Sequence, residues 1–400
     1  MRISKLVFLF LLPYVSWTQT LGYALEQIEG EVMIAKGLNG EGIKIGIIDG
    51  GFLGANHSAS LSNHFAEKRI IYYKDFISPE MTPYGGTTKL NDDHGTHVWE
   101  LIGGQNTQTG IQYGLATAAI YCLARTDHGI RENRDEERFL IQAMDDMISQ
   151  GVKLFNVSLG YTNSFDNSGE NYSPEQIDGK STWITRSLDS LLAIHDVTVV
   201  VSAGNDGDDR WRVLSAPADS KNVITVGASK YSQWENYGYS SIGPTTENNI
   251  KPDIITYASN GTSYSAPVIT GLIACMLQQN PDLSPARIKE ILIQSSHLYP
   301  YPNNHMGYGV PSCTKILGLL NHEDINQILA LKAKKSHVIS DSFVIPKGAK
   351  KRVTVYHKLG WQVIKKQSVK LKKNIRILRK EEATQSTVIA GKEVYEIVWE

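Results

Sequence analysis

Residues 43–48 read Ile-Lys-Ile-Gly-Ile-Ile, and Asp49, Gly50 and Gly51 follow them directly. Short apolar runs that are rich in β-branched residues and bounded by glycines are typical of buried strands. Similar runs recur at residues 119–123, 153–157, 197–202 and 223–226. We therefore expect residues 43–48 to form one strand of a sheet that is covered on both faces.

Helix-length amphipathic stretches separate these runs, for example at residues 136–150 and 182–194. Residues 263–279 are apolar almost all round, which is typical of a central, buried helix. Strands that alternate with helices predict an α/β fold, a three-layer sandwich with a mainly parallel central sheet. In such sheets, functional sites gather at the carboxyl ends of the strands.

The chain changes character after about residue 338, where alternating segments appear at 352–356, 374–378 and 394–399. In the last of these, Tyr395, Ile397 and Trp399 would share one face of a strand. These segments predict a small antiparallel β-rich module. The module is also basic: residues 331–400 hold 17 Lys and Arg against 6 Asp and Glu, whereas residues 1–330 hold 23 against 35.

The first residues resemble a secretory signal. Arg2 and Lys5 precede an apolar run, residues 6–17, that is too short to span a bilayer, which needs about 20 residues. A buried N-terminal helix or strand is the alternative, although Pro13 interrupts the run. The predicted organisation is a signal peptide at 1–18, an N-terminal bridge at 19–37, an α/β domain at 38–320 and the basic module at 321–400.

Charge and cysteine content exclude several classes of protein. The formal net charge of −1 gives no electrostatic case for a nucleic-acid binder. Cys122, Cys275 and Cys313 are too widely spaced for a metal site, so we expect small buried hydrophobes, with one disulfide bridge as the lesser option.

Four polar segments carry candidate chemistry, and each has a simpler structural explanation when it is taken alone. Asp49 ends a strand but could be a turn residue, and Asn205 in Gly-Asn-Asp-Gly could belong to an ordinary turn. His94, after a predicted N-cap at Asp93, could be a surface group or bind metal with His97. Ser263 precedes the buried helix and could be only its N-cap.

Together the four segments resemble the subtilisin-like serine peptidases, or subtilases. The matching segments are Asp49-Gly50, His94-Gly95-Thr96-His97, Ala203-Gly204-Asn205 and Gly261-Thr262-Ser263 with Pro267, in the chain order of that family. The similarity covers about residues 38–320 and looks closest to exported subtilases of Bacteroidetes-type bacteria.

The resemblance implies a role for each matching residue. Asp49, His94 and Ser263 would be the catalytic triad, and the Asn205 side chain would help to form the oxyanion hole. Ser158, Leu159 and Gly160 would pair with the substrate backbone, while Ser202, Ala203 and Gly204 would form the opposite wall of the primary specificity pocket.

Three departures from the family pattern bear on activity. Trp99-Glu100 replace the usual Ala-Gly behind the histidine, and Tyr264-Ser265 follow the serine. The segment from Asp253 to Ser263 is about half the usual length, which predicts a more open or an imperfectly built site. A catalytically impaired binding or scaffold protein with this fold is therefore the alternative function.

We thus expect a secreted or extracytoplasmic serine endopeptidase that acts on proteins or peptides. An esterase of the α/β-hydrolase type is disfavoured because Gly-x-Ser-x-Gly is not found at Ser263. No cofactor and no metal are expected: family members often bind calcium, but no D-x-[DN]-x-[DN]-G loop is present. No transmembrane segment is expected after signal cleavage, and the C-terminal module would serve sorting or surface attachment.

Overall fold

The computed structural model describes residues 20–86, 92–129, 131–243, 249–321, 334–345, 352–370, 376–390 and 393–400. The predicted signal peptide lies outside the described residues. Within them, no helix is both long enough and apolar enough to cross a membrane.

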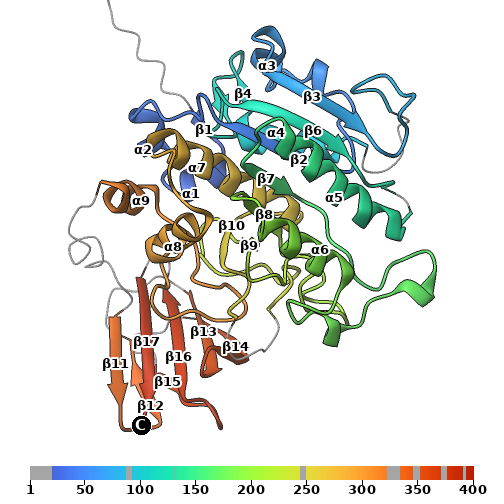
Figure 1. The fold of residues 1–400 in the computed structure, drawn as a ribbon. Helices are drawn as coiled ribbons and strands as arrows, with labels where there is room; N and C mark the ends of the chain where they lie inside the picture. Colours follow the sequence, from blue (N-terminus) through green and yellow to red (C-terminus); the bar gives the residue numbers. More distant parts are fainter. Residues whose placement is uncertain are drawn as a thin grey trace, which may run out of the picture.

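A seven-stranded parallel sheet forms the centre of the molecule (Figure 1). Its strand order is β10-β9-β8-β7-β2-β6-β3. The strands are β2 (Lys44–Asp49), β3 (Ile70–Asp75), β6 (Ile120–Arg125), β7 (Leu154–Val157), β8 (Thr198–Ser202), β9 (Ile224–Ser229) and β10 (Ile254–Tyr257). The expected three-layer α/β sandwich with a parallel sheet is confirmed. The order reverses direction between β2 and β7, which is where open α/β sheets place their binding crevice.

Both faces of this sheet are covered, as the unbroken apolar strands require. In β6, Tyr121 and Leu123 join the core on one face, whereas Cys122 and Ala124 join the core on the other. Helices α4 (His94–Gly103) and α7 (Ala266–Gln279) contact one face, and α5 (Arg134–Ser149) contacts the other beside α6 (Trp183–Leu192). The predicted central helix is α7, in which twelve consecutive residues from Ala266 to Leu277 are buried.

The remaining helices and short strands surround this framework. The helices are α1 (Tyr23–Gln27), α2 (Glu31–Ala35), α3 (Ser62–Ala66), α8 (Pro285–Ser295) and α9 (Cys313–Leu320). The short strands β1 (Thr20–Leu21), β5 (Ile111–Gln112) and β4 (Gln105–Asn106) form a three-stranded sheet in that order. All three cysteines are buried and free, so the disulfide option is wrong.

A second sheet, drawn in orange and red in Figure 1, lies at one end of the molecule. Its order is β11-β17-β16-β13-β14, and β12 pairs with β15 beside it. The strands are β11 (Lys334–Val338), β12 (Ser342–Val344), β13 (Arg352–Leu359), β14 (Gln362–Lys370), β15 (Arg376–Leu378), β16 (Gln385–Ala390) and β17 (Glu393–Trp399). Tyr395, Ile397 and Trp399 share its small core, as expected.

One pairing in this second sheet differs from the expected antiparallel module. Strand β11 runs parallel to β17, with Val338 opposite Trp399, while the other pairs are antiparallel. A parallel neighbour needs a long connection, and β11 and β17 stand at opposite ends of the module's sequence.

Polar contacts join the second sheet to the α/β region that contains the seven-stranded sheet. The Tyr356 hydroxyl donates to Asn236 Oδ1 at 2.9 Å, and Lys366 Nζ donates to the same oxygen at 2.9 Å. The Val363 N–H donates to Asn304 Oδ1 at 2.9 Å. Tyr356 is fully buried by this packing.

Candidate active site

The carboxyl ends of β2, β7 and β8 and the start of α7 meet at one cleft of about 450 Å³. Its lining includes His94, Ser263 and Asn205. These residues are far apart in the sequence, and the parallel sheet brings them to the same edge because all its strands end there.

His94 and Asp49 form the best-defined contact of the site. Asp49 is the last residue of β2 and is fully buried, and His94 is the first residue of α4. The two are joined by a contact of 2.5 Å between His94 Nδ1 and Asp49 Oδ1. The Gly50 N–H also donates to Asp49 Oδ1, at 2.8 Å. The carboxylate therefore fixes the orientation of the ring and leaves Nε2 as the free ring nitrogen.

Gly95 allows this close approach of α4 to β2. A Cβ atom at Gly95 would lie 2.5 Å from the Gly51 carbonyl oxygen and 2.9 Å from Asp49 Cβ. The Gly95 N–H donates to that same carbonyl at 2.8 Å. Glycine is thus required at this position for the histidine to reach the carboxylate.

The His94 ring is largely buried, with 19% of its side chain exposed. Burial works to lower the pKa of the ring, but the charge of Asp49 and the hydrogen bond to it outweigh burial. Asp127 and Asp93 act in the same direction as Asp49, so the pKa lies above its usual value. Asp93 precedes α4 as predicted, but its side chain makes no capping bond and lies 3.7 Å from His97 instead.

Ser263 lies in a 3₁₀ turn, Thr262–Tyr264, directly before α7. Its hydroxyl donates to the Ser158 carbonyl oxygen at 3.2 Å, and the Ser158 hydroxyl donates to the Ser263 carbonyl oxygen at 3.0 Å. Ser263 therefore lies in the same cleft as His94, but in this structure its hydroxyl is bonded to Ser158 and not to the histidine. The ring of Tyr264 lies 5.4 Å from the His94 ring.

Asn205 follows β8, and its side-chain oxygen is held in place. Asn205 Oδ1 accepts hydrogen bonds from the Thr262 N–H at 2.8 Å and from the Thr262 hydroxyl at 3.1 Å. Because both donors engage Oδ1, the amide Nδ2 is left as a donor, and it has no acceptor in the described part of the chain. The Ser263 N–H also has no acceptor in the described part of the chain. The cleft therefore contains two hydrogen-bond donors without an acceptor, Asn205 Nδ2 and the Ser263 N–H.

The predicted substrate-binding residues divide into two groups. Ser158, Leu159, Gly160, Ser202 and Gly204 line the cleft. Among the described residues, the main-chain groups of Leu159 and Gly160 have no hydrogen-bond partner, so they are free to bind an extended peptide. Ala203 does not line the cleft: its side chain packs in the core with Val199 and Val201, because alternate residues of a strand face opposite sides.

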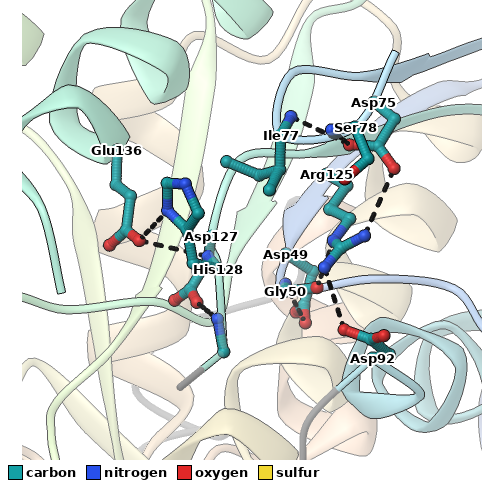
Figure 2. A network of polar contacts seen from close by, with 11 residues as sticks. Asp49, Gly50, Asp75, Ile77, Ser78, Asp92, Arg125, Asp127, His128 and Glu136 are labelled. Carbon is teal, nitrogen blue, oxygen red and sulfur yellow. Dashed lines mark hydrogen bonds and ion pairs between the residues drawn. The ribbon is translucent and has the colours of Figure 1, made fainter. Parts of the chain in front are cut away.

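Arg125 is a site residue that the sequence analysis missed. It ends β6 and is buried, and its side chain donates to the Gly50 carbonyl oxygen at 3.0 Å and to Asp92 Oδ1 at 2.9 Å. A longer contact of 3.4 Å joins it to Asp75 (Figure 2). Arg125 thus ties the residue after Asp49 to the segment before His94. The one sequence signal for Arg125 as a site residue was its position just after the carboxyl end of a predicted strand.

Acidic groups that were not predicted also stand at the cleft. Asp127 and Glu132 line it, and together with Glu136 they bring three carboxylates within 4.8 Å of one another. Among the described residues, these three form the group whose carboxylate oxygens lie close enough together to hold a metal ion. The signal for them was weak, because acidic residues at the start of a helix such as α5 are common without any ligand.

Comparison with known proteins places this chain in a family. The model of the subtilase family matches residues 40–309. Serine protease AprX of Bacillus subtilis is 25% identical over 295 residues, or 64% of this chain and 61% of AprX. Subtilisin DY of Bacillus licheniformis is 24% identical over 284 residues, or 68% of this chain and 90% of that protein. The solved CspB protease of Clostridium perfringens has the same fold, with a TM-score of 0.60 at 17% identity over 76% of this chain and 100% of its own. The chain therefore belongs to the subtilase family of serine peptidases.

Proposed function

We propose that the chain is a secreted serine endopeptidase that cleaves peptide bonds through Asp49, His94 and Ser263. The observation that carries the proposal is the 2.5 Å contact between Asp49 and His94 Nδ1 in the cleft that also contains Ser263. A carboxylate that orients a histidine beside an alcohol is the arrangement used to activate a serine nucleophile.

The reaction begins when the Ser263 hydroxyl turns from the Ser158 carbonyl toward His94 Nε2. A serine side chain changes its hydrogen-bond partner by rotation about one bond, and catalytic contacts often tighten only when substrate binds. His94 takes the hydroxyl proton as Ser263 Oγ attacks the substrate carbonyl carbon. The negative charge that forms on the carbonyl oxygen is stabilised by the Asn205 amide and the Ser263 N–H.

The tetrahedral intermediate then collapses, and the C–N bond breaks. The leaving amine takes the proton from His94, and the acyl group stays on Ser263 Oγ. A water molecule attacks this ester after giving its proton to His94, and the acid product leaves as the proton returns to Ser263. Asp49 stabilises the histidine cation during both steps.

The alternative, a binding or scaffold protein, is favoured by one observation. The Ser263 hydroxyl bonds to Ser158 rather than to His94, which would suit a site that has lost turnover. The free main-chain groups of Leu159 and Gly160 would then hold a peptide without cleaving it.

Peptide hydrolysis by single and double variants tests the proposal. Ser263→Ala and His94→Ala should each lower kcat/KM on a chromogenic peptide by at least about 10⁴-fold, and the double variant should lose little more, because the residues act as one unit. A well-folded parent chain without hydrolysis would support the scaffold function, and additive losses in an active chain would contradict a triad that acts as one unit. Export remains a prediction from residues 1–18, and a mature chain that still begins at Met1 would contradict it.

A further inference from the structure

The segment that leads from β10 to Ser263 is short and makes few contacts of its own. Strand β10 ends at Tyr257, and residues 258–261 alone connect it to the 3₁₀ turn that contains Ser263. Ser259 and Asn260 are exposed, and within the described part of the chain they make no hydrogen bond. The course of this segment must therefore be fixed from outside.

Tyr239 bonds both ends of this segment through one hydroxyl group. The hydroxyl donates to the Ala258 carbonyl oxygen at 2.5 Å and accepts the Gly261 N–H at 3.1 Å. Burial raises the pKa of the hydroxyl, so it keeps the proton that it donates. The two hydrogen bonds span the exposed residues and fix the distance between the end of β10 and the turn.

The main chain beside the same tyrosine is bonded to the segment that carries Asn205. The Tyr239 carbonyl oxygen accepts the Gly207 N–H at 2.8 Å. Two residues later, the Ser241 N–H donates to the Gly204 carbonyl oxygen at 3.0 Å. These bonds hold the chain on both sides of Asn205. Tyr239 therefore connects the Asn205 segment to the Ser263 segment.

Gly261 lies next in the chain to the groups that would stabilise the oxyanion. Its carbonyl oxygen accepts the Tyr264 N–H at 3.1 Å, which closes the turn around Ser263. The N–H of the following residue, Thr262, donates to Asn205 Oδ1 at 2.8 Å. A displacement of Gly261 would therefore move both proposed oxyanion donors, the Asn205 amide and the Ser263 N–H.

We propose that Tyr239 is a positioning residue, whose hydroxyl fixes Gly261 and through it the geometry of the oxyanion donors. The proposal rests on the peptidase function proposed above, and it assigns Tyr239 a role through Asn205 and Ser263 without contact with the substrate carbonyl. Oxyanion donors act only when they are aimed at the place where charge develops. A misplacement of about 1 Å can cost about 10²-fold in rate.

Tyr239→Phe removes the hydroxyl and keeps the ring, which stacks at 5.4 Å on the ring of Tyr237. We expect kcat on a chromogenic peptide to fall by about tenfold or more with little change in KM, because the oxyanion donors act in the transition state. The affinity for a peptide boronic acid, a tetrahedral transition-state analogue, should fall by the same factor as kcat/KM. Titration of active sites with a fluorophosphonate corrects both values for any loss of folded protein.

Tyr237→Phe is the matched control, because it removes the same atom from the partner ring of the stacked pair. The Tyr237 hydroxyl makes no hydrogen bond to any described residue. This variant should therefore keep the parental kcat and the parental affinity for the boronic acid. A Tyr239→Phe chain with parental kcat, or equal losses in the two variants, would overturn the proposal.

Hydrogen–deuterium exchange tests the same contact without any use of activity. In the Ser263→Ala background, which prevents self-cleavage, the amides of residues 258–262 should exchange faster in Tyr239→Phe and at the parental rate in Tyr237→Phe. Equal exchange in all three chains would overturn the proposal whether or not the parent is active. A folded parent chain without hydrolysis would contradict the peptidase function, and the exchange result would then decide the role of Tyr239 alone, so the two proposals fail separately.

Discussion

His94 shows how a single residue receives its chemistry from its surroundings. Burial alone would lower the pKa of the ring below its usual value of 6.5, but the adjacent Asp49 carboxylate reverses the effect. The same carboxylate engages Nδ1, which leaves Nε2 as the proton acceptor. A histidine acts as a general base only when it is neutral. A raised pKa therefore keeps the ring protonated up to a higher pH, so activity is lost at a higher pH on the acid side of the profile.

We therefore expect kcat/KM to fall with decreasing pH through a midpoint above 6.5, the usual histidine value. Asp49→Asn removes the charge that raises the pKa, so its acid midpoint should move to lower pH, while activity falls by about 10⁴-fold. Peptide hydrolysis measured from about pH 5 to about pH 9 checks both effects. An acid midpoint that is the same in the parent and in Asp49→Asn would show that His94 is not the titrating group.

At the scale of elements, the ends of β2 and β6 hold the site together with the start of α4. Arg125 bonds the carbonyl after Asp49 and the carboxylate of Asp92, two residues before His94 (Figure 2). Asp49 and Arg125 also stand opposite each other in the register of β2 and β6. We therefore expect Arg125 to be a positioning residue, which would act on the proposed reaction through the spacing of Asp49 and His94.

Arg125→Met should lower both stability and activity, because it leaves the buried carboxylates of Asp75 and Asp92 without their cation. Removing one partner of a buried ion pair costs about 3–5 kcal/mol of unfolding free energy. We expect kcat to fall more than KM changes, and Arg125→Lys, which retains the charge, to recover part of both losses. Urea unfolding and steady-state kinetics measure them. Arg125→Met with parental kcat would contradict a positioning role.

The elements that carry the candidate site were well predicted from sequence, whereas contacts between them were not. The run at residues 43–48 predicted β2 to within one residue, because a strand buried on both faces has a strong apolar signal. Strand β3 was missed, since it lies at the sheet edge and is only partly buried. The Arg125 network joins residues up to 75 positions apart, and no local pattern reveals such pairs. The orientation of the Ser263 hydroxyl depends on Ser158, which lies 105 positions away in the sequence.

At the scale of the whole molecule, buried histidines couple stability to pH. Burial lowers the pKa of His64 to about 4 and the pKa of both His297 and His305 to about 3. His64 stacks on Trp99, the large ring that replaces the small residue usual in the family, and His305 lies 6.0 Å from Tyr356 of the second sheet. These neutral rings therefore stand where α4 and the second sheet pack.

Stability should fall as the pH drops from about 6.5 toward 4. Below pH 6.5 these histidines take up protons in the unfolded chain but stay neutral in the folded chain. Their contribution to the free energy of unfolding is therefore fully present above pH 6.5, and it is lost as the pH falls toward the lowered pKa values. For His64 alone the decline is about 1.4 kcal/mol per pH unit. Urea unfolding at several pH values checks this, with His64→Leu expected to show a shallower decline. The same slope in both proteins would contradict the assignment.

Covalent labelling of Ser263 tests the central claim most directly, that Asp49, His94 and this serine act as one catalytic unit. A fluorophosphonate reacts only with a serine that a neighbouring base has activated. Intact mass spectrometry and peptide mapping should show a single adduct on Ser263 of the parent chain. The adduct should be absent in Ser263→Ala and nearly absent in His94→Ala. A folded parent chain that forms no adduct, or forms it equally without His94, would contradict the account.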